Sequence, residues 1–189
     1  MIGGVSDVSA GMLLVATPAL LDPNFVDTVV LLLDVNDDGA LGVVLNRPTA
    51  LAVSEVLGHW GDVVAEPEVL FQGGPVDTNG ALAVALRRGK DHESVGFREV
   101  DGALGLLDLD TPVELVTGTL DALRIFAGYS GWGAEQLQRE IAEGHWYVVP
   151  GIAPDVFRSD TVELRRDVMR RQPGDLAWHS TRPADPDLN

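Results

Sequence analysis

The chain has 189 residues, of which 46% are hydrophobic, and a formal net charge of −16, so we expect one soluble cytoplasmic domain large enough to fold without metals or disulfides. The absence of cysteine excludes a disulfide framework, a thiolate zinc site and thiol redox chemistry, and apolar runs such as Val29 to Leu33 are far too short for a membrane span. The acidic charge repels the phosphates of nucleic acids and of anionic lipids, which disfavours direct nucleic-acid binding and membrane association.

The first half of the chain has the pattern of β-strands. The expected strands cover residues 11–16, 27–33, 40–45, 68–72 and 81–86, and the two arms of a hairpin over 97–107. Residues 34–39 are rich in Asn and Asp, which predicts a hairpin turn, and Asp101–Gly102 predicts another. Because the apolar residues are continuous rather than alternating, we expect strands covered on both faces. A short helix is expected over 51–60.

Helix signals appear in the second half. The expected elements are helices over 111–118, 134–143 and 160–171 and strands over 120–129 and 146–149, with a helix over 120–129 as the alternative. Thr111 and Asp160 are N-cap candidates with Glu three residues later, and Leu137 and Ile141 are spaced for one helix face. Strands followed by helices, without βαβ alternation, indicate the α+β class.

We expect a single domain over 1–189, with an ordered core over about 11–171. The ends, 1–9 and 181–189, are rich in Gly and Ser or in Pro and Asp, and such termini are often loosely held. No repeat or long linker divides the chain.

Four arginines, Arg165, Arg166, Arg170 and Arg171, form the main basic cluster. The simplest interpretation is a solvated helix face with cations near its C-terminal end, where the helix dipole favours them. The alternative is a DNA-binding helix of a transcriptional regulator, which the acidic charge of the chain disfavours.

The loop Asp34–Gly39 matches the first half of an EF-hand calcium loop. Leu45 stands where a bidentate Glu is required, and strands rather than helices flank the loop. We therefore expect a hairpin and no metal. No phosphate-binding or dinucleotide motif is complete either, so we expect no cofactor.

Ser130 lies in Gly128-Tyr-Ser-Gly-Trp-Gly133, which is similar to a nucleophile elbow. Trp132 occupies the position of the closing glycine, so the motif fails. A hydrolase using Ser130 would need a histidine, such as His145, and a carboxylate within reach. The alternative is a turn between a strand and a helix, packed by Tyr129 and Trp132.

Two further segments follow strands. The glycines of Gly73–Gly74–Pro75 lack a P-loop lysine, which favours a structural role. Arg47, in Asn46–Arg47–Pro48, either pairs with a carboxylate of its own fold or receives an anionic ligand.

Taken in order, several segments together resemble the AlgH/YqgE family of small bacterial proteins. They are Pro18–Asn24, Thr28–Leu31, Asn36–Pro48, Phe71–Val76 and Gly128–Leu137, with Glu140, Ile141 and Trp146. The resemblance covers about residues 11–171. It implies a mixed, mostly antiparallel branched sheet curled into a barrel-like body with helices packed around it.

The resemblance implies no settled activity. One member is named for regulation of alginate production, from which the description of transcriptional regulator derives. Members often carry a Cys-Glu-His-like segment where this chain has Leu33-Asp34-Val35. A function based on that thiol cannot operate here.

These observations together favour a non-enzymatic binding or regulatory protein. We expect Asn46–Arg47–Pro48, Gly73–Gly74–Pro75 and Tyr129, Ser130 and Trp132 to converge around a groove, because ligand sites often form at strand ends. The expected partner is a small anion or a protein segment. The sequence does not indicate the oligomeric state.

Overall fold

The structure, a computed structural model, describes residues 8–89 and 94–181. In these ranges the strands are β1 (Leu13–Ala16), β2 (Val29–Asn36), β3 (Gly39–Val44), β4 (Pro48–Ala52), β5 (Val69–Gln72), β6 (Val76–Arg87), β7 (Phe97–Asp101), β8 (Leu104–Leu107), β9 (Leu120–Gly133) and β10 (Trp146–Val149). The α-helices are α1 (Val53–Val56), α2 (Gln136–Ala142), α3 (Ala153–Phe157) and α4 (Leu164–Arg170). The 3-10 segments are η1 (Gly58–Trp60), η2 (Val113–Leu115), η3 (Thr117–Thr119) and η4 (Gly174–Thr181). The prediction of loose ends falls mainly on residues outside the described ranges.

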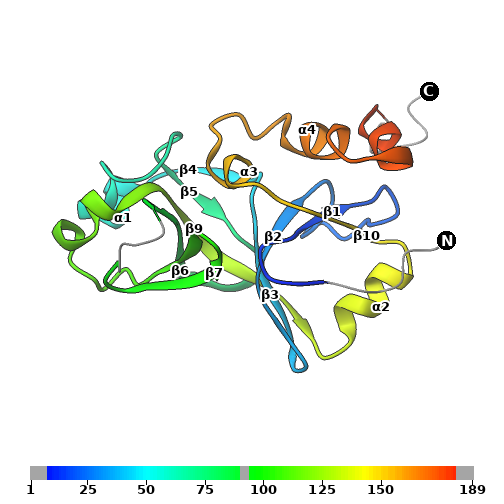
Figure 1. Cartoon of the computed structure of the whole chain (residues 1–189), viewed down its shortest axis with the longest axis horizontal. Helices are drawn as coiled ribbons and strands as arrows, with labels where there is room; N and C mark the ends of the chain where they lie inside the picture. The colour runs from blue at the N-terminus through cyan, green and yellow to red at the C-terminus, as the bar shows by residue number, and fades with distance from the viewer. Residues whose placement is uncertain (1–7, 90–93, 182–189) are drawn as a thin grey trace.

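The strands form one branched sheet in the order β10-β1-β2-β3-β9-β6-β8-β7, and β5 branches from β9 and carries β4. The described pairs are antiparallel except for β5 with β9. Figure 1 shows two lobes side by side. We call them the half-barrel lobe, built from β4 to β9, and the helix-covered lobe, in which α2, α3 and α4 surround β1, β2 and β10. The expected α+β class, with a mostly antiparallel branched sheet and helices around it, is confirmed.

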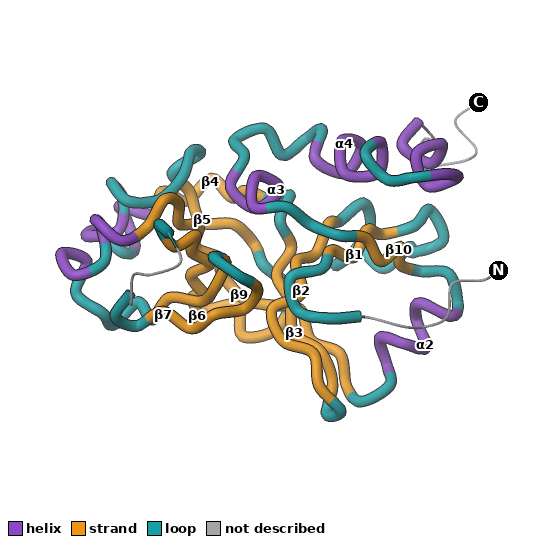
Figure 2. The backbone as a smooth tube through the Cα atoms, in the orientation of Figure 1, coloured by secondary structure: helices purple, strands orange, loops and turns teal. Residues whose placement is uncertain are grey.

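Strands β1 and β2 are covered on both faces, as their continuous apolar sequences predict. Leu13 packs in one cluster with Val168 of α4, and its neighbour Leu14 packs in another cluster with Leu137 of α2. Adjacent side chains of a strand point to opposite faces, so the two clusters lie on opposite sides of the sheet. Figure 2 shows helices on both sides of these strands.

Strand β9 joins the two lobes. Its first part, Leu120 to Ala127, pairs with β6, as does Tyr129 with Val76, and its last part, Ser130 to Gly133, pairs with β3. Between them Gly128 has φ of +72°, a backbone conformation that L side chains rarely adopt. The glycine lies where the pairing with β6 is interrupted, and β3 becomes the partner from Ser130 onward.

The apolar interior of the half-barrel lobe is closed by short helical turns rather than by a long helix. Trp60 of η1 and Val116, between η2 and η3, pack in one cluster with Leu123 and Ile125 of β9. This cluster is separate from the two that cover β1 and β2.

Some helix predictions were wrong. The region 51–60 begins as β4 and continues as two short turns, α1 and η1, and the region 111–118 forms 3-10 turns without a side-chain cap at Pro112. The expected turn at residues 130–133 is instead the continuation of β9. Sequence analysis also missed β4, α3 and η4. These elements have five to eight residues each, too few to show a clear periodicity.

Arg124 of β9 is a buried cation that fastens the two lobes together. Its side chain is 1% exposed, and its Nη1 donates hydrogen bonds to the carbonyl oxygens of Val156 at 2.8 Å and Arg158 at 3.0 Å. Its Nη2 donates to the carbonyl oxygen of Glu66, and the guanidinium lies 4.2 Å from the centre of the Phe71 ring. Burial lowers the pKa of Arg124 to about 10, so the cation is held by carbonyl dipoles and an aromatic face.

We predict that Arg124→Met lowers the free energy of unfolding by about 3 kcal/mol or more, because each buried carbonyl left without a donor costs about 1–3 kcal/mol. Urea unfolding at neutral pH measures this change. The matched control is Arg88→Met, which removes an exposed pair with Asp121 and should cost less than about 1 kcal/mol. Equal losses in the two variants would contradict the role of Arg124.

Candidate functional site

The three segments expected to form a groove meet through their backbones. The N–H of Gln72 donates to the carbonyl oxygen of Arg47 at 2.9 Å, and the N–H of Gly73 donates to that of Ala127 at 2.8 Å. The carbonyl oxygen of Gly73 accepts from the N–H of Val44 at 2.9 Å. The segments before Pro48 and before Pro75 and the part of β9 around Ala127 are therefore neighbours.

Gly73 and Gly74 are required by this close approach. A Cβ atom at Gly73 would lie 2.3 Å from the carbonyl oxygen of Gly128, and one at Gly74 would lie 2.2 Å from that of Tyr129. No side chain fits at such distances without moving the backbone. The structural role expected for these glycines is confirmed.

Asn46 and Arg47 use their polar groups inside the fold. Asn46 Oδ1 accepts from the N–H of Val29 at 3.0 Å, and its Nδ2 donates to the carbonyl oxygen of Asp27 at 2.9 Å. Arg47 donates to three carbonyl oxygens, those of Pro23, Asn24 and Val26, at 2.6–3.2 Å. The expected carboxylate partner of Arg47 was therefore wrong, and this side chain holds the loop between β1 and β2.

Ser130 is completely buried, and its Oγ donates to the carbonyl oxygen of Gly73 at 3.0 Å. A nucleophilic serine must reach its substrate and hydrogen-bond to a base. In this position the hydroxyl group joins β9 to the glycine loop, so the geometry does not support a hydrolase that uses Ser130.

Tyr129 and Trp132 lie on opposite faces of β9. Tyr129 packs on the cluster beneath α3 and α4, whereas Trp132 belongs to the cluster beneath α2. The Trp132 ring lies 5.9 Å from Phe25 and 6.0 Å from Trp146, measured between ring centres. The structure therefore brings the segments together but does not place their aromatic side chains around one cavity.

A polar groove lies where Asn46 reaches the surface. It has a volume of about 370 Å³. Its lining residues are Asp27, Asn46, Thr161, Val162, Glu163, Arg165 and Arg166. We call it the Asn46 groove. It lies between the end of the β1–β2 loop, which Arg47 holds, and the start of α4.

The charges in the Asn46 groove balance. Arg166 Nη1 lies 3.0 Å from Glu163 Oε2. Arg165 donates through Nε and Nη2 to the carbonyl oxygen of Ala16 at 3.3 and 2.8 Å. Burial lowers the pKa of Arg165, and the negative charge of Asp27 partly opposes this. Two cations and two carboxylates give the groove no excess charge to attract a small anion.

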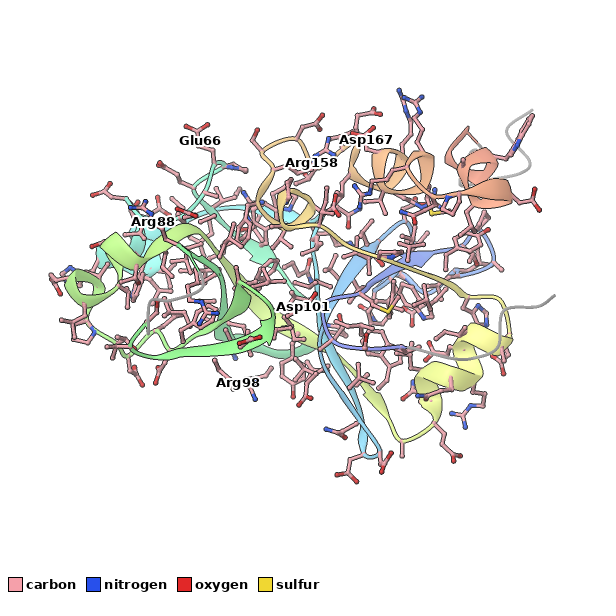
Figure 3. All side chains as sticks on the ribbon, viewed as in Figure 1. Glu66, Arg88, Arg98, Asp101, Arg158 and Asp167 are labelled. Carbon is pink, nitrogen blue, oxygen red and sulfur yellow. The ribbon has the colours of Figure 1, made fainter. Side chains whose placement is uncertain are left out.

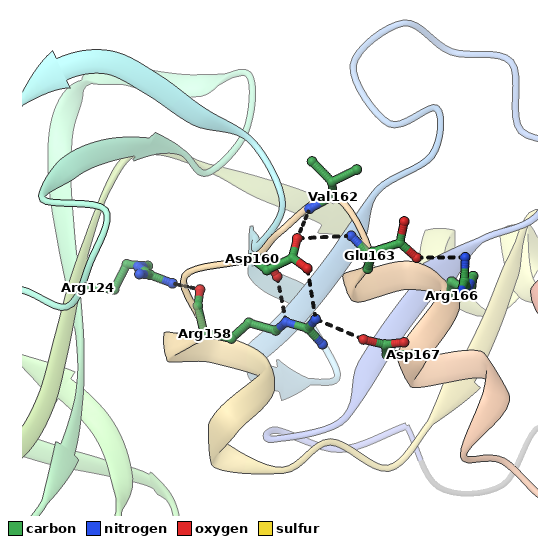
Figure 4. Close-up of polar contacts among 7 residues, drawn as sticks. All are labelled: Arg124, Arg158, Asp160, Val162, Glu163, Arg166 and Asp167. Atoms are coloured by element: carbon green, nitrogen blue, oxygen red, sulfur yellow. Dashed lines mark hydrogen bonds and ion pairs between the residues drawn. The ribbon is translucent and has the colours of Figure 1, made fainter.

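The segment before α4 is fixed by Asp160 and Arg158 (Figure 4). Asp160 Oδ1 accepts from the N–H of Val162 at 3.1 Å, and Arg158 Nε donates to the carbonyl oxygen of Asp160. Arg158 Nη2 also donates to Asp167 Oδ2 at 2.8 Å. Val162, at the outside of this turn, is 88% exposed. The prediction of Asp160 as the N-cap of a helix over 160–171 was wrong, because α4 begins only at Leu164 and Asp160 closes the turn before it. Nothing in the sequence indicated the groove.

Most arginines of the basic cluster bind groups of the same chain. Besides Arg165 and Arg166, Arg171 binds both carboxylate oxygens of buried Asp155 at 2.9 and 2.6 Å. Of the four arginines, Arg170 alone has no hydrogen bond or ion pair through its side chain to a described residue. The expectation of a solvated cationic face was wrong for Arg165, which is half-buried, whereas Arg171 is exposed at the C-terminal end of α4 but is already bound to Asp155. These two are therefore poor candidates for binding phosphates.

Sequence reasoning identified Asn46 but missed Asp27, Thr161 and Val162. Asp27 has φ of +60°, an uncommon conformation for a residue other than glycine, and nothing in its sequence context indicates it. Residues 27 and 161 are far apart in the chain, and their proximity depends on α4 packing over β1 and β2. Only the structure reveals that arrangement.

The sequence profile of the AlgH-like family matches residues 13–177. The chain belongs to the AlgH-like family. The resemblance inferred from the sequence is thereby confirmed. Among its relatives, a UPF0301 protein of Streptomyces coelicolor is 52% identical over 191 residues, covering 98% of this chain and 99% of the relative. A UPF0301 protein of Mycobacterium tuberculosis is 43% identical over 180 residues, covering 94% of this chain and 89% of the relative.

Two solved structures share the AlgH-like fold. A protein of Corynebacterium diphtheriae is 29% identical, with a TM-score of 0.87 and 93% of each chain covered. The AlgH protein of Pseudomonas aeruginosa is 26% identical, with a TM-score of 0.68 and coverage of 92% of this chain and 93% of that one. No specific function is established for the AlgH-like family, so membership leaves the activity to be argued from the site.

Within the described ranges, no helix is both long and apolar enough to cross a membrane. The longest α-helices there, α2 and α4, have seven residues each. A membrane span needs about 20.

We predict that Asp167→Asn lowers the urea midpoint at neutral pH and that the difference from the wild type shrinks on acidification. The hydrogen bond from Arg158 holds the pKa of Asp167 below its ordinary value. Because the folded carboxyl is the more acidic, its stabilising contribution is full above the ordinary pKa of about 4 and is lost as the pH falls through the lowered value.

The control is Asp175→Asn, an exposed carboxylate that makes no ion pair with a described residue. It should match the wild type at both about pH 7 and about pH 2.5. A difference for Asp167→Asn that is as large at the acidic pH as at neutral pH would show that the contact with Arg158 is not ionic.

Proposed function

We propose that this protein is a non-enzymatic binding protein of the bacterial cytoplasm that docks a segment of another protein in the Asn46 groove. The observation that carries the proposal is the combination of balanced charges and exposed apolar side chains around a groove of about 370 Å³. Val162 is 88% exposed, and Val26, next to Asp27, is 37% exposed. Asp27, Asn46 and Arg166 supply the polar part.

A polypeptide fits this surface better than a small anion does. A peptide backbone presents both N–H and C=O groups and therefore needs acceptors as well as donors. The Asn46 groove offers both, through Asp27 and Glu163 and through Arg165 and Arg166. A small anion needs an excess of positive charge, which the ion pair between Arg166 and Glu163 removes.

In this proposal the predicted residues have two kinds of role. Asn46 lies in the wall of the groove, and Arg47 holds the loop that carries Asp27 through the carbonyl oxygens at 23, 24 and 26. The Gly73–Gly74 loop and Ser130 fix the strand ends behind that wall. A regulatory role would follow from which protein docks.

We predict that peptides selected from a random display library for binding to the wild-type protein bind about tenfold more weakly to Val162→Asp and to Arg166→Glu, because each change alters the apolar or charged part of the groove. Isothermal titration calorimetry measures the affinities. The matched control is Val95→Asp, at a valine 59% exposed in the half-barrel lobe, which should bind as the wild type does.

Peptides that bind the two groove variants as tightly as the wild type would overturn the proposal. A separate thermal-stability screen with inorganic phosphate and nucleotides tests the small-anion alternative. Stabilisation by phosphate that is lost in Arg166→Glu, together with no selected peptide, would favour that alternative instead.

A further inference from the structure

A small apolar cavity lies at the junction of the two lobes, apart from the Asn46 groove. Its volume is about 150 Å³, and it is more enclosed than the groove. Its apolar walls come from separate parts of the fold: Leu13 and Leu31 from β1 and β2, Leu86 and Leu104 from β6 and β8, and Val156 from α3. Small molecules often bind at such junctions between structural units.

The space stays open because four residues of its lining are very small. They are Gly11, Ala103, Gly151 and Ala153. A Cβ atom at Gly151 would lie 2.9 Å from Leu13 Cγ, so the backbone itself approaches the opposite wall there. A cavity of about 150 Å³ lined by aliphatic side chains is large enough for a group the size of benzene.

Asp101 is the only ionisable residue among those that line the cavity. It is the last residue of β7, and a Cβ at Gly11 would lie 2.5 Å from its Oδ2. The carboxylate thus lies against the first residues of the helix-covered lobe, and Figure 3 labels it between the two lobes. Its side chain makes no hydrogen bond or ion pair with another described residue.

The nearby arginine Arg87 is already engaged. Its Nη2 lies 3.9 Å from Glu99 Oε2 and 3.5 Å from the carbonyl oxygen of Gly102, and its guanidinium lies over the ring of Phe97 at 5.2 Å. Asp101 is therefore left as an exposed carboxylate at an apolar cavity, without a cation from the described residues.

We propose that this cavity binds an alkylammonium group, with its carbon chain among the leucines and its ammonium at Asp101. Burying the chain removes apolar surface from water, whereas the charged end stays at the exposed carboxylate and avoids the cost of burying a charge. A carboxylate ligand would meet the like charge of Asp101. The net charge of −16 also favours the approach of cations.

The test is a titration of the whole protein with n-butylammonium and with neutral n-butanol, which has a similar shape. Methyl chemical shifts of Leu13, Leu31 and Leu104 report binding. We expect n-butylammonium to bind about fivefold more tightly than n-butanol, which is the upper range for an exposed ion pair. Equal affinities, or shifts only outside the cavity, would overturn the proposal.

Two variants separate the charge from the cavity. Asp101→Asn should make the two affinities equal, and Ala103→Leu should abolish binding of both probes by filling the space. The control Asp37→Asn, in the exposed β2–β3 turn, should leave both affinities unchanged. Because Asp101 is exposed and Asn has its shape, that variant should fold. Preference for n-butylammonium that persists in Asp101→Asn would also overturn the proposal.

The alkylammonium group could belong to a free amine or to a lysine side chain. Lysine capped as its Nα-acetyl methylamide distinguishes these sources. Binding of n-butylammonium alone supports a small-amine site, and binding of both probes supports a site that also admits lysine. If neither binds, the proposal is wrong, and this outcome is independent of peptide binding in the Asn46 groove.

Discussion

The fold depends on one strand that belongs to both lobes. Over 14 residues β9 pairs first with β6 and β5 and then with β3. Such a strand must change its neighbours without leaving its hydrogen bonds unmade, because buried N–H and C=O groups without partners are costly. Gly128 permits the bend, and the Gly73–Gly74 loop supplies partners where the sheet divides. The polar side chains around this point also provide hydrogen-bond partners for backbone groups.

That need explains why the segments through which the sequence resembles the AlgH-like family are not themselves an open site. Asn46, Arg47 and Ser130 each satisfy backbone groups of neighbouring segments, and the glycines provide the close approach. Asn46 and Arg47 thereby hold the end of the β1–β2 loop firmly at the surface. The Asn46 groove forms where the end of this loop meets the turn before α4. The contacts that fix the loop therefore also fix the shape of the groove.

The sequence was sufficient for most strands and for the α+β class, because runs such as 29–33 and 40–45 carry their own signal. It failed where the outcome depends on distant packing. Thr111–Glu114 has the composition of a helix start, yet it forms a 3-10 turn against the half-barrel core. The convergence of the segments before Pro48 and before Pro75 was predictable from their positions next to strand ends. The separation of Tyr129 and Trp132 required knowing that β9 continues, and Asp27 and Thr161 meet only through α4.

The positions of the three carbonyl partners of Arg124 in the sequence determine when, during synthesis, the contacts of this side chain can be completed. Glu66 precedes Arg124 by 58 residues, whereas Val156 and Arg158 follow it by 32 and 34. A nascent chain that has only just released β9 from the ribosome lacks two of the three acceptors. At that stage the half-barrel lobe, whose strands end at Gly133, lacks the segment that covers the Arg124 guanidinium. Because a buried cation without partners is costly, we expect the half-barrel lobe to reach its full stability only after residues 156–158 have been synthesised and have packed against it.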